Sequence, residues 1–96
     1  MTKAELVAKI SSNLGLEKNE VLATVENFME EVKNSLNEGE NVYLRGFGSF
    51  VVKKRAEKTG RNISKNVAVK IPAHNIPAFK PAKVFVNGVK SKVEVA

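Results

Sequence analysis

Residues 53–76, with the sequence KKRAEKTGRNISKNVAVKIPAHNI, decide how this chain folds. The stretch contains seven Lys or Arg and one acid, Glu57. Its pattern predicts a two-stranded ribbon that runs out along 53–60, turns at a tip near 61–66 and returns along 67–75, where most of its apolar residues lie. A lone two-stranded ribbon is marginal in water, so we expect it to project from the body and to become ordered mainly against a ligand.

The charges of the chain are divided between its two halves. Residues 1–52 contain five Lys or Arg and eight Glu, for a charge of −3, whereas residues 53–92 contain eleven Lys or Arg and Glu57 alone, for +10; Glu94 brings the total to +6. Positive charge concentrated on a projecting ribbon repels itself, and a polyanion would relieve that repulsion. We expect nucleic acid rather than an acidic membrane, because the basic stretch lacks the apolar stripe of an interfacial helix.

Two helices are expected before the ribbon. Thr2 and Glu5 form the capping-box pattern of a helix over 3–14, and Gly15 is placed to end that helix. A second helix over roughly 18–38 has a broad apolar face and is long for so small a domain. One chain would struggle to cover such a face, which indicates a partner subunit.

Short strands and a last helix complete the body. Strands are expected at 41–45 and 47–54, joined around the GFG at 46–48, where glycine gives the backbone the freedom that a tight passage needs. A final helix over about 82–89 is expected, with a strand as the competing interpretation, because its valines and glycine are weak helix formers.

Catalytic and metal-binding groups are scarce. The chain has no Cys, no Asp and one histidine, His74, which we interpret as a surface residue at the base of the ribbon. There is no phosphate-binding glycine loop or dinucleotide fingerprint, so we expect no enzyme activity, cofactor, metal or small-molecule substrate. We also expect no membrane segment and no signal peptide, and the lack of Cys is compatible with a reducing cytoplasm.

Four short motifs carry a resemblance to a known family. LRGFGSF at 44–50 is followed by GRN at 60–62, IPA at 71–73 and PAFKPAK at 77–83. Together, in this order and at this spacing, they resemble the HU and integration-host-factor family of bacterial histone-like DNA-binding proteins over essentially the full length of the chain.

The resemblance implies an α+β fold in one HU-like domain over 1–96. Residues 1–39 would form a helical hairpin used for dimerisation. Residues 40–52 and 76–96 would form the antiparallel sheet and the short C-terminal helix of the body. Residues 53–75 would form a two-stranded β-arm that binds DNA. Two such chains would intertwine, either as a homodimer or as a dimer with a paralogous subunit.

By position, the resemblance also assigns roles to single residues. The phenylalanines of the dimer core would be Phe47, Phe50 and Phe79. The DNA contacts of the family fall on Arg55, Lys58, Arg61, Asn62, Lys80 and Lys83. The charge of the arm adds three further candidates for phosphate binding, Lys53, Lys65 and Lys70. A role of the phenylalanines as stacking platforms is disfavoured, because they lie outside the cationic stretch.

Ile63 follows the GRN motif at a position where the family usually has a proline that wedges between base pairs. An exposed β-branched residue at a ribbon tip is otherwise unexplained, and apolar residues are the usual wedges of minor-groove benders. We therefore expect Ile63 to be the DNA wedge, with a different tip geometry, because isoleucine does not fix φ as proline does. Asn62 also fits a plain turn residue.

These expectations describe a cytoplasmic protein of the bacterial nucleoid that bends and compacts double-stranded DNA through the minor groove, with little sequence preference. Two alternatives stay open: a site-specific bender of the integration-host-factor type, and a basic module that binds RNA or an acidic protein. A helix that reads the major groove is disfavoured, because residues 17–38 carry six Glu against two Lys and phosphates would repel them.

Overall fold

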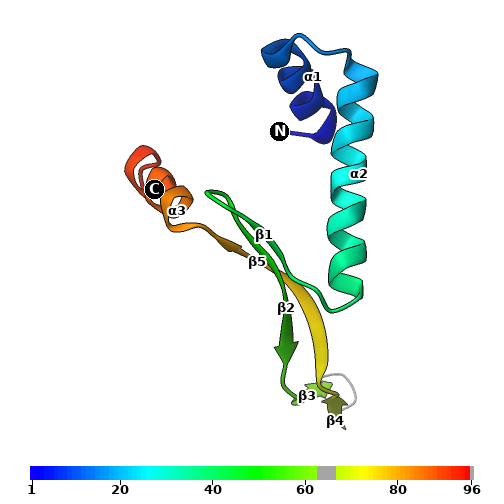
Figure 1. The fold of residues 1–96 in the computed structure, drawn as a ribbon. Coiled ribbons are helices and arrows are strands. Elements are labelled where there is room, and N and C mark those ends of the chain that lie inside the picture. Colours follow the sequence, from blue (N-terminus) through cyan, green and yellow to red (C-terminus); the bar gives the residue numbers. More distant parts are fainter. Residues whose placement is uncertain (63–66, 96) are drawn as a thin grey trace.

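The computed structural model describes residues 1–62 and 67–95, and these residues form an α+β arrangement of three helices and five strands (Figure 1). The fold class expected from the sequence is therefore confirmed. In chain order the elements are α1 (Lys3–Leu14), α2 (Lys18–Asn37), β1 (Val42–Leu44), β2 (Gly48–Arg55), β3 (Lys58–Asn62), β4 (Val67–Ile71), β5 (His74–Pro81) and α3 (Lys83–Lys92).

Local signals set both ends of α1, as predicted. The Glu5 N–H donates to Thr2 Oγ1 at 3.2 Å, which satisfies a backbone donor that the first turn leaves free. Gly15 follows the last turn with a φ of 67°, a left-handed conformation that glycine adopts at little cost. α1 packs against α2, and Val7 and Val21 are the hydrophobic side chains that the described part of the chain buries.

The body sheet has the antiparallel order β1-β2-β5. Phe50 on β2 lies opposite Val42 on one side and opposite Phe79 on the other. β5 is an edge strand, and this explains why it tolerates Pro77, whose missing N–H would break a central ladder.

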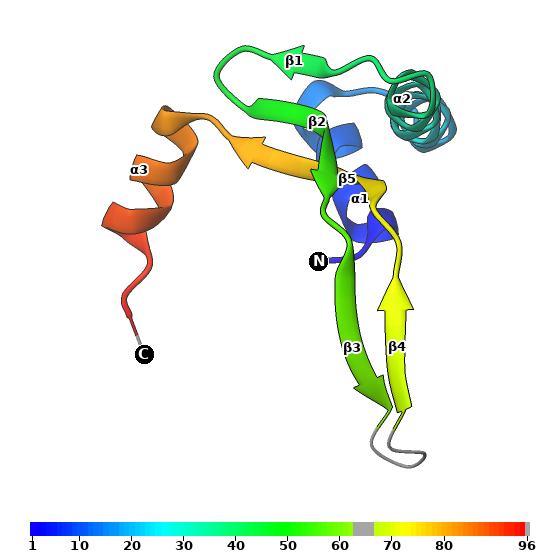
Figure 2. The same cartoon turned by 90° about the horizontal axis from the view of Figure 1, so that it is seen from below.

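The ribbon differs from the single hairpin that the sequence predicts. β2 and β5 stay paired as far as Arg55 and His74, whereas β3 and β4 form a second sheet of two strands, and residues 56–57 and 72–73 lie between the two sheets. Pro72 has no N–H to donate, so the ladder cannot continue through it. The inner end of the expected arm therefore belongs to the body sheet, and β3 and β4 leave the body as a separate ribbon (Figure 2).

The last element is a helix, so the competing strand interpretation is wrong. α3 begins at Lys83 and ends at Lys92, three residues beyond the predicted end. Two lysines, Lys90 and Lys92, lie in its last turn, where positive charge stabilises the carbonyl end of a helix.

The single chain is extended and buries little of its apolar surface. Its radius of gyration is 19.0 Å, whereas a globular domain of this length has about 13 Å. Large apolar side chains stay exposed on several elements, among them Phe28 on α2 (45 %) and Val84 on α3 (75 %). A chain with so small a core of its own requires a further surface to cover it.

We predict that Gly48→Ala lowers the free energy of unfolding by roughly 1–3 kcal/mol through overpacking. A Cβ at this position would lie 2.5 Å from the Lys80 carbonyl oxygen and 2.7 Å from the Phe79 ring. Gly88→Ala in α3 is the control, because its Cβ meets no atom within 4 Å and alanine should stabilise the helix by about 0.5–1 kcal/mol. Urea unfolding at one protein concentration measures both, and an unchanged Gly48→Ala protein would contradict the close approach of β2 and β5.

Candidate nucleic-acid interface

Most cations of the body sheet lie on one of its two faces, whereas Lys54 of β2 projects to the other. Lys53 and Arg55 are two residues apart on β2, so they project to the same side. Arg55 lies directly opposite His74, and Ser49, on that same side of β2, lies opposite Lys80. Residues directly opposite in an antiparallel ladder also share a side. Lys53, Arg55, His74 and Lys80 therefore form one surface, which we call the cationic face.

The other face of the sheet is apolar apart from Lys54 and Asn75 at its arm end. Val42, Phe50 and Phe79 lie opposite one another across the three strands, and Leu44 and Val52 share their side. α2 contacts β1 and β2. Because α2 occupies the apolar side, where its Leu36 faces Val52, the cationic face is left exposed.

The ribbon of β3 and β4 extends this positive surface away from the body. Lys58 begins β3 opposite Ile71, and Lys70 of β4 lies opposite Thr59. Lys70 Nζ forms an exposed ion pair at 2.9 Å with Glu57, the one acid of the arm. Two further predicted arm residues, Arg61 and Asn62, are the last two residues of β3. Ile63 and Lys65 lie outside the described residues.

A second group of cations lies at the far end of β5. Lys80 is close to the end of this strand, and Lys83 begins α3. Lys80 lies six positions after His74, which is about 20 Å along an extended strand. In Figures 1 and 2, β5 runs from the ribbon to α3 and so joins the two groups of cations. A ligand that contacts both groups must be extended.

Most of these cations have no acid to neutralise them. Of the candidate DNA-binding residues with described side chains, Lys70 is the one that forms an ion pair; the five without one in the described part of the chain are Lys53, Arg55, Lys58, Lys80 and Lys83. The two remaining ion pairs lie in the helical part, Lys3–Glu26 at 2.8 Å and Lys33–Glu30 at 3.0 Å. The arm side of the molecule therefore carries a positive field that attracts polyanions.

The structure brings the three predicted core phenylalanines together. The ring centroid of Phe79 lies 5.1 Å from that of Phe47 and 4.9 Å from that of Phe50. Phe85 of α3 stacks on Phe47 at 5.5 Å, and the sequence analysis missed this fourth member of the cluster. The residues Phe47, Phe79 and Phe85 remain 38–45 % exposed. Aromatic rings clustered on one side and open on the other are suited to packing against a second copy of the chain.

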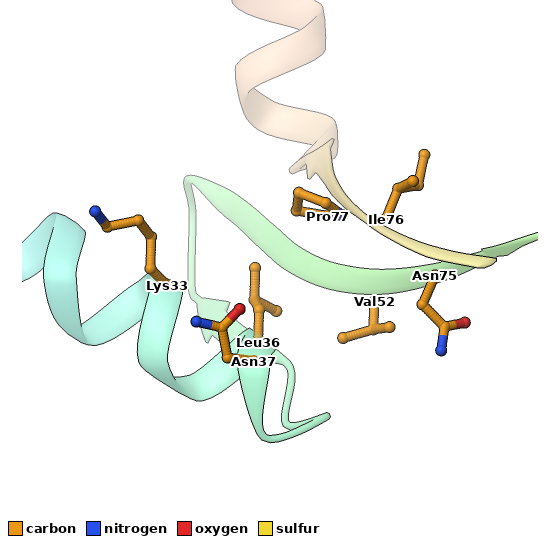
Figure 3. A pocket seen from close by; sticks show the side chains of 7 residues that line it. All are labelled: Lys33, Leu36, Asn37, Val52, Asn75, Ile76 and Pro77. Carbon is orange, nitrogen blue, oxygen red and sulfur yellow. The ribbon is translucent and has the colours of Figure 1, made fainter.

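A cavity of about 310 Å³ lies between the end of α2 and the sheet, on the apolar side (Figure 3). Leu36 reaches toward it from α2, Val52 from β2 and Pro77 from β5. The polar groups around it, Lys33, Asn37 and Asn75, are not arranged around a common point. An open apolar cavity of this kind, beside exposed phenylalanines, is again a surface that a second chain can fill.

Other kinds of site find little support in the described residues. No three His, Cys, Asp or Glu side chains come together there as a metal site requires. None of the described helices is both long enough and apolar enough to cross a bilayer.

Comparison with known proteins gives similarities over nearly the whole chain. The family model described as "Bacterial DNA-binding protein" matches residues 1–90. The chain is 41 % identical over 92 residues to the SPbeta prophage-derived DNA-binding protein HU 2 of Bacillus subtilis, covering 96 % of this chain and all of the relative. It is also 41 % identical over 90 residues to the DNA-binding protein HU of Thermus thermophilus, covering 94 % of this chain and 93 % of the relative.

The fold is similar to that of a solved protein–DNA complex. The Anabaena HU–DNA cocrystal structure matches with a TM-score of 0.89 and 34 % sequence identity, covering 93 % of this chain and 97 % of that chain. The similarity therefore extends over nearly the whole length of both chains.

Proposed function

The chain belongs to the family of bacterial DNA-binding proteins that includes HU, and from this premise we propose that it is an architectural protein that binds, bends and compacts double-stranded DNA. It acts by binding and is not an enzyme. Its sequence preference is low, because phosphate contacts carry no sequence information and selection follows the deformability of the DNA.

The observation that carries the proposal is that two groups of exposed cations, one beside the ribbon and one where α3 begins, lie at the two ends of β5. The cationic face connects Lys58 on the ribbon to Lys80 and Lys83 at the far end of β5. The length of β5 between these groups, about 20 Å, equals roughly six phosphates of one DNA strand. Neutralising phosphates releases counterions, and this release supplies most of the affinity and makes it sensitive to salt.

The arm supplies the bend. β3 and β4 lead the chain outward, and the GRN motif forms the last three residues of β3. Ile63 follows this motif in the sequence. In this proposal the ribbon enters the minor groove and Ile63 partly unstacks one base step. The deformation costs on the order of a few kcal/mol, and the contacts that the bent DNA makes with the body offset this cost. Lys80 and Lys83 are placed to make those contacts.

Two chains act together. The half-exposed phenylalanine cluster and the open cavity beside α2 are covered when a second copy packs against them, and the second copy adds a second arm. We propose a homodimer that intertwines through these surfaces. A dimer holds one duplex between two cationic ribbons. Each ribbon can then bend the DNA from its own side. The proposed location is the nucleoid in the bacterial cytoplasm.

The two alternatives from the sequence are not favoured. Relatives that match the whole length are named DNA-binding protein HU, and a neighbour with this fold is a complex with DNA. A module that binds RNA or an acidic protein would use these same cations for a different partner.

We predict that Lys58→Ala with Arg61→Ala weakens binding to all duplex sequences alike. The slope of log affinity against log salt should fall by about 0.9 for each phosphate that the variant no longer neutralises. Lys18→Ala with Lys33→Ala removes the same charge from α2 and serves as the control, with little change expected. Fluorescence anisotropy over a salt series measures the slopes. Equal weakening by both double variants would contradict the arm assignment, and tighter binding of single-stranded RNA than of duplex at equal salt would favour the RNA alternative.

We predict that Ile63→Ala reduces the bend more than it reduces affinity, because the smaller side chain cannot wedge a base step apart. The bend should decrease by about 20° or more, the lower end of the kinks that such wedges produce. Energy transfer between dyes at the two ends of a saturated duplex measures the bend. Ser64→Ala is the neighbouring control, and an Ile63→Ala complex bent as strongly as this control would exclude the wedge.

A further inference from the structure

The break between the two sheets leaves a cavity at the base of the arm. Its volume is about 390 Å³, and it lies where residues 56–57 and 72–73 separate the body sheet from the ribbon. It is lined by two cations, one acid, one histidine and two apolar residues: Arg55, Lys58, Glu57, His74, Ala56 and Ile71. His74 is the one histidine of the chain, and the DNA contacts described above leave it without a role.

A hydrogen bond of the His74 ring engages Nδ1 and leaves Nε2 available to a ligand. Nδ1 lies 3.0 Å from the Pro72 carbonyl oxygen. A carbonyl oxygen can only accept, so Nδ1 carries the hydrogen of this bond. Nε2 is then a bare acceptor in the neutral ring and an N–H donor in the protonated ring. A neutral ring would present a lone pair to an anionic oxygen, whereas a protonated ring donates a charge-assisted hydrogen bond to it.

The charges around His74 are arranged for an anion. Arg55 lies directly opposite on β2, and Lys53 follows on the same face. Lys58 of β3 borders the cavity, and so does Glu57, whose carboxylate is held by Lys70 of β4. Two cations, Arg55 and Lys58, therefore line this cavity together with His74, and the one acid that lines it is paired with Lys70. A phosphate between Arg55 and His74 could accept a charge-assisted hydrogen bond from each of them.

We propose that His74 is a further phosphate-binding residue that works together with Arg55 and binds a backbone phosphate of duplex DNA in its protonated form. This inference rests on the proposed function, because it places the DNA backbone across the cationic face. DNA binding and proton uptake at His74 are then linked. The linkage favours the complex in acid, and the added affinity is lost as the pH rises through the range in which histidine side chains release their proton.

The test is the affinity for a 20-base-pair duplex at constant ionic strength between pH 5.5 and pH 8. Binding should tighten by about tenfold toward the acid end for each arm that gains one protonated contact, which corresponds to one pK unit of coupling. His74→Gln keeps polarity without titrating, so its affinity should stay near the alkaline value at every pH. His74→Arg carries a permanent charge, so its affinity should stay high and nearly flat. Thermal unfolding of both variants checks that the fold is retained.

A second readout follows the proton itself. The chain has one histidine, so NMR of the protein with and without duplex reports a single imidazole titration. DNA should move its midpoint to higher pH by about one unit. A pH dependence of affinity that persists in His74→Gln, or a midpoint that DNA leaves unchanged, would overturn the role of His74 while DNA binding itself stands. Failure of the parent protein and of His74→Arg to bind duplex even at low salt would instead overturn the proposed function.

Discussion

The structure depends on one constraint: β3 and β4 carry positive charge and form a sheet of their own. Strands in a two-stranded sheet satisfy half of their backbone groups with each other and leave the rest to water or to a ligand. Self-repulsion among the arm cations also opposes burial of the ribbon in the body, since buried cations require partners. A bound nucleic acid relieves this repulsion, because its phosphates neutralise the cationic side chains and accept hydrogen bonds from them.

The body has exposed apolar surface, where the ribbon has unneutralised positive charge. Its sheet has an apolar face that α2 covers only in part, and the phenylalanine cluster and the cavity at Leu36 and Val52 remain open. A second chain supplies the missing apolar surface, just as DNA supplies the missing negative charge. The acidic helix α2 lies on the apolar side of the sheet, away from the cationic face, so the two partners do not compete for one surface. Charge segregation along the sequence thus becomes segregation of two binding surfaces in space.

Local signals in the sequence were sufficient for some elements and not for others. The ends of α1 were predictable because Thr2 and Gly15 act within a single turn. The place of Phe85 was not, since it depends on how α3 packs against the sheet and not on the sequence of α3. The break in the ribbon had a signal, Pro72, whose missing N–H ends the ladder, although the apolar residues of the return strand suggested one continuous hairpin.

The residues of the candidate site, too, were predictable only in part. The cations of the arm could be found from charge alone, because they are close together in the sequence. The shared face of Arg55, His74 and Lys80 depends on the register between β2 and β5, and register is a property of the sheet. For this reason the sequence analysis assigned His74 to the base of the ribbon and gave it no partner.

Hydrogen exchange of the ribbon amides, with and without duplex DNA, tests most directly whether the arm exists to hold a polyanion. Amides of β3 and β4 should exchange much faster than those at the centre of β2 in the free protein, and they should become protected when DNA is added. Ribbon amides that are protected as strongly as those of β2 without DNA, or that DNA leaves unprotected, would contradict this role of the arm.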